Sequence, residues 1–300
     1  MTLVAAGSVA LAAGLDRLVA EPPAALHPVA WLGRALGPLD RPWSRPRLAG
    51  LLVAGAVPLL VAALAGGLVV VGDRIDPLVG GVAAGLVCFV ATSRRMLLAE
   101  ARAVVALSGT ELPAARERLR SLAGRDAAAL DAGDVRSAAV ESAAENLADG
   151  LVAPLAGFAL LAPVSLPLAA AAAAWIKAVN TLDSTFGYRS KPMGWAPARL
   201  DDLTMWLPAR ASAALLAVAA GRPGALRSAR PLAHVTDSPN AGWPMATLAV
   251  LLGVRLEKPG AYALPGGPAP PTPADADRGV AVVSRAGWLA FGLAGVIALC

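Results

Sequence analysis

The chain has 300 residues, of which 57% are hydrophobic and only 16% are charged, and its mean hydropathy is +0.61. About a quarter of the residues of a soluble domain are charged, so this composition excludes an ordinary soluble globular protein. The formal net charge is +5, and 23 of the 26 basic residues are arginine. No basic patch with interleaved aromatic residues accompanies that charge, so we expect arginine-rich cytoplasmic loops of a membrane protein and no nucleic-acid partner.

Small apolar residues, mainly Ala, Leu, Val and Gly, supply most of the hydrophobicity. Such residues let helices approach closely in lipid, where van der Waals fit replaces the hydrophobic drive. The predicted fold class is therefore all-α: a polytopic integral membrane helical bundle with a cytoplasmic helical segment.

Residues 1–93 are predicted to form the N-terminal membrane helices, with a cytoplasmic loop at 21–47. Met1–Leu15 is apolar but short, whereas Leu48–Gly72 contains no charge and is long enough to cross a bilayer core about 30 Å thick. Pro77–Ser93 follows after only four residues. The pair is therefore predicted to form a helical hairpin through the membrane.

Residues 94–149 are the largest polar block and are predicted to form cytoplasmic helices, because apolar residues recur there at helical spacing opposite many arginines. Asp134 is the predicted N-cap of a helix that starts at Val135 and runs towards the membrane. Arginine is concentrated in this block and in the 21–47 loop, and the positive-inside rule places both in the cytoplasm.

Residues 150–258 are predicted to be membrane and interfacial helices that carry polar motifs. Their first part, Gly150–Ile176, is uncharged but contains three prolines, so it is either one kinked span or a re-entrant pair of half-helices. The Pro/Gly-rich stretch 259–279 is a predicted linker without regular structure, and 280–300 is a predicted C-terminal membrane helix.

The predicted helix from Asp134 carries Glu141, Glu145 and Asp149 at i, i+4 and i+8, hence on one face. Like charges at that spacing repel, and a divalent cation would relieve the repulsion. Mg²⁺ characteristically takes one or two carboxylates plus substrate phosphates, and Asn146 adds a neutral ligand beside the stripe. The alternative is a solvated face paired with nearby arginines.

Lys177, Asn180, Asp183 and Ser184 follow the uncharged run at helical spacing. Polar groups that converge at a membrane boundary are a functional hypothesis by default. Lys177 and Asp183, about 9 Å apart along a helix axis, are predicted to flank one bound phosphate or carboxylate. The alternative is an interfacial helix cap with a snorkelling lysine.

A third cluster contains Arg199, Asp201 and Asp202, with Arg210 beyond it. An ion pair between Arg199 and Asp202 at i,i+3 is the purely structural alternative here. The sequence contains no Walker-type phosphate loop, dinucleotide fingerprint or nucleophile elbow.

These clusters, read as sequence strings, resemble in family order the CobD/CbiB proteins, the adenosylcobinamide-phosphate synthases of cobalamin biosynthesis. The strings are Leu26–Val29 with Gly33–Arg34, Gly124–Asp126 with Leu130–Asp131, Val140–Asn146, Asp149–Pro154, Lys177–Ser184, Gly187–Tyr188, Gly194–Trp195, Ala198–Asp202, Pro208–Arg210 and Ser238–Pro244. The chain departs from the family's pattern at Glu21, where an Asp is expected, and at Met205, where an Asn is expected. We therefore assign no role to these two residues.

The resemblance implies ATP- and Mg²⁺-dependent formation of an amide bond between a propionate carboxylate of adenosylcobyric acid and aminopropanol or its phosphate. It implies a metal site of Glu141, Glu145 and Asp149, phosphate contacts by Lys177, Arg199 and Arg210, and a proton acceptor in Asp201 or Asp202. The candidate catalytic residues are Asp201, Asp202, Lys177 and Asp183. The candidate substrate- and phosphate-binding residues are His27, Arg34, Arg125, Asn146, Asn180, Ser184, Tyr188, Arg199, Arg210 and Asn240.

The same resemblance implies a multi-pass protein of the bacterial inner membrane whose active site faces the cytoplasm. Its expected partners are the corrinoid and amine substrates and the lipid bilayer, together with a second copy of the chain or another membrane enzyme of cobalamin assembly. Two other functions stay open: a non-catalytic membrane regulator related to the family, such as the AmpE-like proteins, and an ion or solute transporter.

Overall fold

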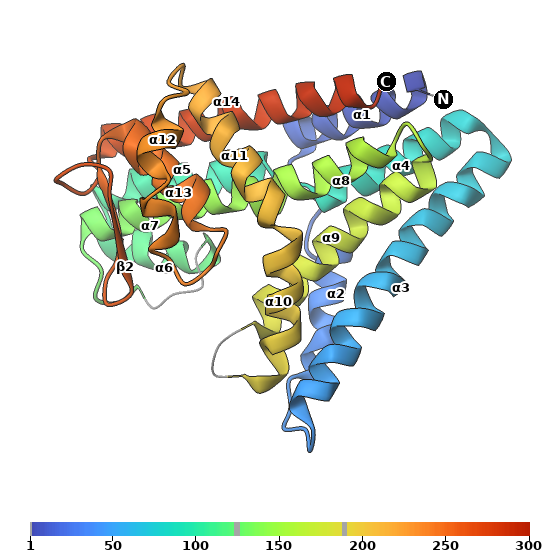
Figure 1. The fold of residues 1–300 in the computed structure, drawn as a ribbon, viewed down its shortest axis with the longest axis horizontal. Coiled ribbons are helices and arrows are strands. Elements are labelled where there is room, and N and C mark those ends of the chain that lie inside the picture. Colours follow the sequence, from blue (N-terminus) through green and yellow to red (C-terminus); the bar gives the residue numbers. More distant parts are fainter. Residues whose placement is uncertain (1, 123–126, 188–190) are drawn as a thin grey trace. The chain divides into compact units, whose positions relative to one another are not determined.

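A computed structural model describes residues 2–122, 127–187 and 191–300 (Figure 1). The described chain is helical apart from one two-stranded sheet. It divides into two compact units. The first unit contains residues 1–93, 149–205 and 291–300, and the second contains residues 94–148 and 206–290.

The first unit is built from long helices and their short connections. Its elements are α1 (Thr2–Val19), α2 (Pro28–Leu36), η1 (Gly37–Leu39), α3 (Pro46–Ile75), α4 (Pro77–Ala91), most of the π-helical turn η2 (Ala148–Val152), α8 (Ala153–Leu161), α9 (Leu166–Phe186), η3 (Pro192–Gly194) and α10 (Trp195–Thr204).

The predicted helical hairpin is present, formed by α3 and α4. The reversal takes place at Asp76, whose side chain accepts a hydrogen bond of 2.7 Å from the Leu78 N–H and so caps α4. Pro77 at the first helical position suits this start, because its missing N–H would have no partner inside the helix. The two charge-free runs therefore correspond to the two helices, and the turn between them lies at Asp76 and Pro77.

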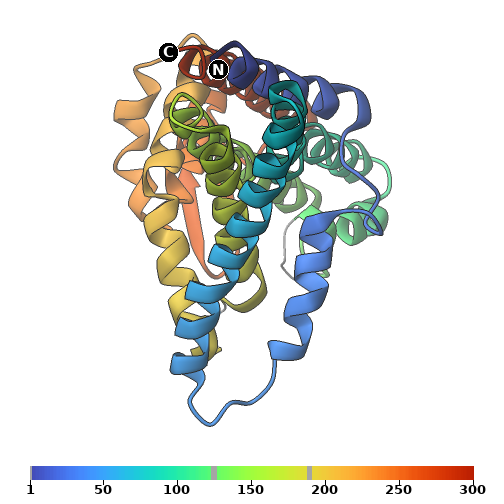
Figure 2. The same ribbon diagram turned by 90° about the vertical axis from the view of Figure 1, so that its right-hand side faces the viewer.

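Helix α3 runs beside α9 in both views (Figures 1 and 2), and small residues let the two backbones meet. A Cβ added to Gly66 would lie 3.0 Å from the Pro167 carbonyl oxygen near the start of α9. A Cβ added to Gly50 would collide with the Met193 carbonyl oxygen, just beyond the end of α9. Glycine is required at Gly50 because only the absence of a side chain allows that approach.

Helix α2 is held against the C-terminal half of α9 by an apolar cluster. Leu36 of α2 is packed in one core with Leu182 and Phe186 of α9 and with Met193. The exposed fraction of Leu182 and of Phe186 is 0%. This packing fixes the segment before α2, where His27 lies, relative to the polar end of α9.

The segment Gly150–Ile176 is not a single continuous helix. Helix α8 ends at Leu161, and α9 begins at Leu166 and packs against it, so the two form a helical hairpin. The side chain of Ser165 caps α9 by accepting a hydrogen bond from the Leu168 N–H. The segment therefore contains two helices in place of one kinked span, and the re-entrant arrangement stays a prediction.

The second unit contains shorter helices and the sheet. Its elements are α5 (Arg95–Ser108), α6 (Leu112–Leu122), α7 (Ala132–Leu147), α11 (Trp206–Ala219), α12 (Ala225–Ala229), η4 (Leu232–His234), α13 (Gly242–Leu252), β1 (Arg255–Lys258), β2 (Tyr262–Pro265) and most of α14 (Pro273–Ile297).

The start of the acidic helix α7 differs from the prediction. Asp131, and not Asp134, is the N-cap, and its side chain accepts a hydrogen bond of 2.8 Å from the Asp134 N–H. The Asp134 carboxylate in turn accepts a hydrogen bond from the Asp131 N–H. The prediction was wrong by three residues because both aspartates belong to one capping box, of which Asp134 is the inner member.

The prediction of an unstructured linker at 259–279 is wrong at both of its ends. Residues Tyr262–Pro265 pair antiparallel with Arg255–Lys258, and α14 already begins at Pro273. Gly260 has a φ of +74° in the turn, a conformation that glycine adopts readily. Leu256 and Leu264 face each other in the ladder and are fully buried, which explains why a Pro/Gly-rich stretch folds.

Five helices of the described chain are long and apolar enough to cross a membrane, judged by length and composition. They are Thr2–Val19, Pro46–Ile75, Pro77–Ser108, Ala132–Leu161 and Pro273–Ile297. Helices α11 and α13 are apolar but shorter, and α9 is not among the five. The structure is therefore consistent with the predicted polytopic membrane helical protein.

Candidate functional site

His27 begins a polar cluster in the first unit. Its Nδ1 atom accepts a hydrogen bond of 3.2 Å from the Val29 N–H, so His27 caps α2 and its neutral ring carries the proton on Nε2. Nε2 lies 3.5 Å from a carboxylate oxygen of Glu21. Burial lowers the pKa of His27, Glu21 opposes this and Lys177 adds to it. His27 is therefore neutral at physiological pH and presents a fixed donor to Glu21.

Lys177, on α9, belongs to the same cluster. Its side chain is half-buried. Burial lowers the pKa of Lys177, while the charges of Glu21 and Asp149 raise it. A cation whose charged form is held by two carboxylates is well placed to meet an oxyanion, because it is poorly hydrated and fixed in position.

Asp183 and Asp202 form a second cluster of the first unit. Asp202, on α10, forms an ion pair of 3.1 Å with Arg199, so the structural pairing considered for these two residues is present. Burial and, to a smaller extent, the charge of Asp202 raise the pKa of Asp183 to about 6. A half-buried carboxylate that ionises close to neutral pH suits proton transfer.

Lys177 and Asp183 therefore belong to different clusters, although they lie six residues apart on one helix. Six residues turn an α-helix by about 600°, which leaves the two side chains about 120° apart around the axis. Lys177 interacts electrostatically with Glu21 and Asp149, and Asp183 interacts with Asp202. The prediction that the two flank one bound phosphate finds no support in these partners.

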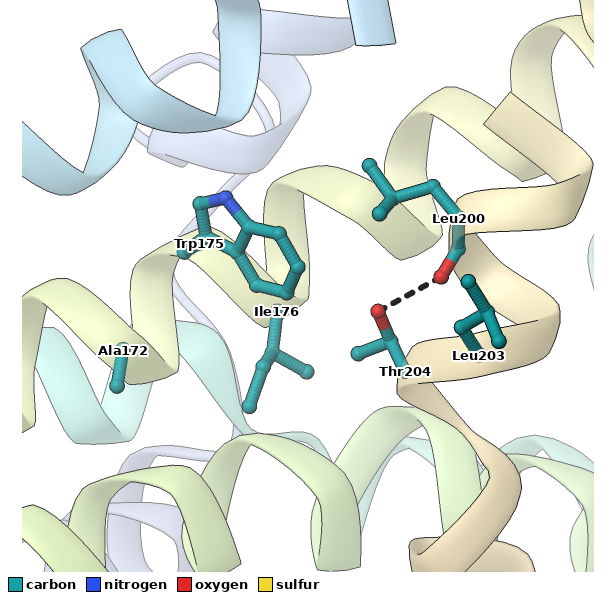
Figure 3. A pocket seen from close by; sticks show the side chains of 6 residues that line it. All are labelled: Ala172, Trp175, Ile176, Leu200, Leu203 and Thr204. Carbon is teal, nitrogen blue, oxygen red and sulfur yellow. Dashed lines mark hydrogen bonds between the residues drawn. The ribbon is translucent and has the colours of Figure 1, made fainter. Parts of the chain in front are cut away.

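An apolar groove of about 450 Å³ lies between α9 and α10, the helices that carry Lys177 and the Asp183 cluster (Figure 3). It is lined by Ala172, Trp175 and Ile176 from α9 and by Leu200, Leu203 and Thr204 from α10. The Thr204 hydroxyl donates to the Leu200 carbonyl, as the dashed line shows, so the walls offer few free polar atoms. Such a surface can take the apolar part of a large molecule.

Glu141, the first predicted metal ligand, is enclosed in the second unit. Its exposed fraction is 0%, and its two oxygens accept hydrogen bonds of 2.8 Å from the Ser137 and Tyr262 hydroxyls. The Ser137 oxygen also accepts a hydrogen bond of 2.7 Å from the Glu257 N–H of β1. The carboxylate is fully enclosed and both of its oxygens are engaged by protein donors, surroundings that suit a structural role better than a metal ligand.

Across the described residues, no three His, Cys, Asp or Glu side chains are grouped as a metal site. Glu145 and Asp149 are both half-buried and stay predicted ligands. Asn146 is half-buried, and its amide donates to the Ser142 carbonyl oxygen at 3.0 Å.

Arg210 and Asn240 are brought together in the second unit. The Nη1 atom of Arg210 donates to the Asn240 side-chain oxygen at 3.1 Å. The guanidinium lies over the Trp206 ring at 4.2 Å and 5.0 Å from the centre of the Trp243 ring. Arg210 and Asn240 come from two of the strings, Arg210 on α11 and Asn240 just before α13.

The remaining predicted site residues that the structure describes are exposed or half-buried. Arg34 is exposed and donates to the Ala24 carbonyl at 3.3 Å. Ser184 is exposed and donates to the Thr181 carbonyl at 3.0 Å, whereas Asn180 and Asp201 are half-buried. Arg125 and Tyr188 lie outside the described residues.

Sequence reasoning left out Glu21, which the structure places beside His27 and within electrostatic reach of Lys177. The signal was present, since an acidic residue six positions before His27 stands where the family expects Asp. It was set aside because the residue differs, although Glu and Asp carry the same charge.

Comparison with known proteins agrees with the strings. The family described as CobD/Cbib protein matches residues 9–284. A probable cobalamin biosynthesis protein CobD of Methanothrix thermoacetophila is 34% identical over 294 residues, covering 93% of this chain and 92% of that protein. The cobalamin biosynthesis proteins CobD of Rhodobacter capsulatus and Geobacter metallireducens are each 37% identical and cover 94% and 91% of this chain and 93% and 91% of their own lengths. No solved structure matches the chain significantly.

The family match spans more than nine-tenths of the chain and includes both polar clusters of the first unit as well as Arg210 and Asn240. The described helices, five of them long and apolar, fit a multi-pass membrane member of such a family. The chain belongs to the CobD/CbiB family of cobalamin biosynthesis proteins.

Proposed function

We propose that the chain is an ATP- and Mg²⁺-dependent amide ligase that joins aminopropanol, or its phosphate, to a propionate carboxylate of adenosylcobyric acid. The observation that carries the proposal is the presence on α9 of two separate polar clusters with different chemistry. One cluster holds a cation among carboxylates at Lys177, and the other holds a carboxyl group, Asp183, whose pKa is raised to about 6.

The two clusters match the two chemical problems of amide synthesis. A carboxylate is a poor electrophile, so one of its oxygens must first become a phosphate or adenylate leaving group, and negative charge develops on the transferred phosphoryl group. Lys177 is the cation that we assign to that charge. The amine must then lose a proton as its lone pair attacks the carbonyl carbon and the carbon–oxygen bond to the leaving group breaks.

Asp183 is the group that we assign as the acceptor of that proton. Asp202 is engaged by Arg199 in an ion pair of 3.1 Å, which occupies one of its carboxylate oxygens. Asp183 instead is half-buried beside the charge of Asp202 and holds a proton more tightly. This assignment refines the prediction that the acceptor is Asp201 or Asp202 and leaves Asp202 with an electrostatic role.

The metal and the large substrate are assigned by the chemistry of the residues present. Mg²⁺ neutralises charge on transferring phosphates, and we assign Glu145 and Asp149 to it, leaving out Glu141 because its carboxylate is fully buried among protein donors. The apolar groove between α9 and α10 is our assignment for one edge of the corrinoid. We further propose a cytoplasm-facing site in the inner membrane, and assembly with a second copy or another membrane enzyme of cobalamin synthesis.

The direct test uses the full chain in lipid nanodiscs with adenosylcobyric acid, aminopropanol phosphate, ATP and Mg²⁺. Mass spectrometry of the corrinoid should show addition of the amine with loss of water, with one nucleotide consumed per amide formed. Release of ADP or of AMP identifies the activating step. A chain that forms no amide with either amine, while the purified protein is folded, would refute the ligase and favour the regulator or the transporter.

A further inference from the structure

Arg210 of the second unit is held from three sides. Its Nη1 atom donates to the side-chain oxygen of Asn240 and to the Trp206 carbonyl oxygen. The guanidinium carbon of Arg210 lies 4.2 Å from the centre of the Trp206 ring and 5.0 Å from the centre of the Trp243 ring. Asn240 itself is only 4% exposed. The guanidinium is therefore fixed in position and orientation before any ligand arrives.

The other edge of the Arg210 guanidinium, made of Nε and Nη2, has no hydrogen-bond or ion-pair partner among the residues that the structure describes. Arg118 in the same unit shows what this edge binds, because its Nε and Nη2 atoms each donate at 2.9 Å to one oxygen of Glu100. Two parallel N–H groups at this spacing match the two oxygens of a carboxylate or phosphate. Arg210 presents the same pair of N–H groups, which we call the fork, without such an anion.

Two further polar groups of this region lack partners. The indole Nε1 of Trp243 is buried and has no hydrogen-bond partner within the described chain, and the same holds for the hydroxyl of Thr247, one helical turn further along α13. A buried donor without an acceptor costs free energy and is uncommon in native proteins. Trp243 therefore has a buried N–H without an acceptor, and the centre of its ring lies 5.0 Å from the Arg210 guanidinium carbon, whose open edge also lacks an anion.

The kind of ligand follows from the number of acceptor atoms required. The fork takes two oxygens and the indole N–H takes a third, whereas a carboxylate has only two oxygens. A phosphate group has three or more and carries negative charge. Helices α11 and α13 are apolar, and a phosphate would also offset the positive charge of the half-exposed Arg210 beside them.

We propose that Arg210 and Trp243 form a binding site for a phosphate group, with Arg210 holding two oxygens through Nε and Nη2 and Trp243 holding a third through its indole N–H. The proposal rests on the proposed function where it names the source, which is a nucleotide phosphate or the phosphate of the amine substrate. A lipid headgroup offers the same chemistry and is separated from these by the experiment.

The test measures binding of inorganic phosphate to the full chain in detergent, without turnover, by tryptophan fluorescence and calorimetry. Wild type should bind phosphate at least tenfold more tightly than acetate, which corresponds to about 1.4 kcal/mol. Arg210→Lys keeps the charge but loses the fork and should weaken phosphate binding at least tenfold. Trp243→Phe should weaken phosphate binding but leave acetate unchanged. The matched control Arg118→Lys should bind phosphate like wild type.

Equal phosphate binding by Arg210→Gln and wild type would overturn the site, as would equal affinity for phosphate and acetate. Should the Arg210 variants fail to fold, as judged by circular dichroism, wild type alone decides the question. Phenylglyoxal modification of Arg210, read by mass spectrometry, must then be slowed by phosphate, and an unchanged rate rejects the proposal.

Competition identifies the source of the phosphate. Metal-free ATP, aminopropanol phosphate and phosphatidylglycerol vesicles are each tested for displacement of inorganic phosphate, and displacement by none of them counts against the site. Phosphate binding at Arg210 in a chain that makes no amide refutes the ligase alone. Amide synthesis without phosphate binding at Arg210 refutes this site alone.

Discussion

Asp202 acts on Asp183 through its charge: burial and then the Asp202 carboxylate raise the pKa of Asp183 to about 6. If Asp183 accepts the amine proton, it works only when ionised, so kcat/KM should fall as pH falls through about 6. Asp202→Asn removes one cause of the raised pKa and should move this acid limb to lower pH. A pH–rate profile of amide formation checks the shift.

Arg199→Gln is expected to have the opposite effect to Asp202→Asn. Arg199 pairs with Asp202 at 3.1 Å and offsets its charge. Its removal should strengthen the effect of Asp202 and move the acid limb to higher pH, opposite to Asp202→Asn. Acid limbs that coincide in all three proteins would exclude Asp183 as the titrating base.

Asp183→Asn should abolish activity without loss of stability. The folded-state pKa of Asp183 is raised above its ordinary value of 3.8, so the folded chain binds the proton more tightly than the unfolded chain. Its contribution to stability is therefore present at low pH and is lost as pH rises from about 4 to about 6. At pH 7.5 the variant should melt at the wild-type temperature or above it, and a marked drop would mean that the carboxylate is structural.

Lys177→Arg should lower kcat/KM at least tenfold, about 1.4 kcal/mol, because arginine is planar and bulkier and does not replace a compact ammonium at a phosphate. Glu21→Gln removes a charge that raises the pKa of Lys177, so any loss of activity at alkaline pH should begin at lower pH in this variant. Steady-state kinetics at fixed membrane abundance measures both effects.

Lys191→Arg is the control for Lys177→Arg. Lys191 forms a partly exposed ion pair of 2.6 Å with Asp40 in the same unit, and exposed pairs of this kind contribute little. Its kinetics should stay at the wild-type level. Unchanged kinetics in Lys177→Arg as well would leave Lys177 as an interfacial anchor.

Glu141 and the pair Glu145 and Asp149 should respond differently to mutation. Tyr262→Phe leaves an oxygen of the buried Glu141 carboxylate without its 2.8 Å donor, at a cost of about 1–3 kcal/mol. Thermal stability should fall while the Mg²⁺ concentration for half-maximal activity stays constant. Glu145→Gln and Asp149→Asn should instead keep the melting temperature and lose activity by orders of magnitude.

The control here is Glu141→Gln, which keeps the shape of the side chain. It should loosen β1 and β2, so that trypsin cleaves after Arg255 faster than in wild type. An increased Mg²⁺ requirement in this variant, with unaltered proteolysis, would restore Glu141 as a metal ligand.

The orientation of the second unit's helices is a separate prediction. A single cysteine at position 118, in a chain with Cys88 and Cys300 replaced by serine, should react with a membrane-impermeant reagent only after the membrane is opened. The reason is the concentration of arginine around α5 and α6. Labelling in intact spheroplasts would reverse the assigned topology.

The long elements of the fold could be predicted because charge-free runs have one stable form in lipid. The hairpin at Asp76 followed from two such runs separated by four residues. The β-hairpin could not, because each strand has only four residues and alternation over so few positions carries no signal. Its folding depends on Leu256 and Leu264 meeting each other and on Ser137, far away in the chain.

The sequence could predict which residues belong to the candidate site, but it could not predict which of them interact with one another. Helical spacing relates only residues of one helix, and it suggested that Lys177 and Asp183 act together. The electrostatic partner of Lys177 is Glu21, from a segment before α2 whose position depends on the packing of Leu36 against α9. Similarly, spacing on α7 put Glu141 with Glu145, whereas Tyr262 from the sheet determines what Glu141 can bind.

The close approach of α3 to α9 has a consequence for substrate selection. Gly66 meets the backbone near the start of α9, and Gly50 meets the Met193 carbonyl in η3, so α3 contacts the chain near both ends of this helix. Lys177 and Asp183 lie on this one continuous helix, which fixes their spacing at about 9 Å along its axis. In the proposed reaction this spacing sets the distance between the phosphate and the base. Amines would then be selected by length, since a chain one carbon longer or shorter places its nitrogen away from the base.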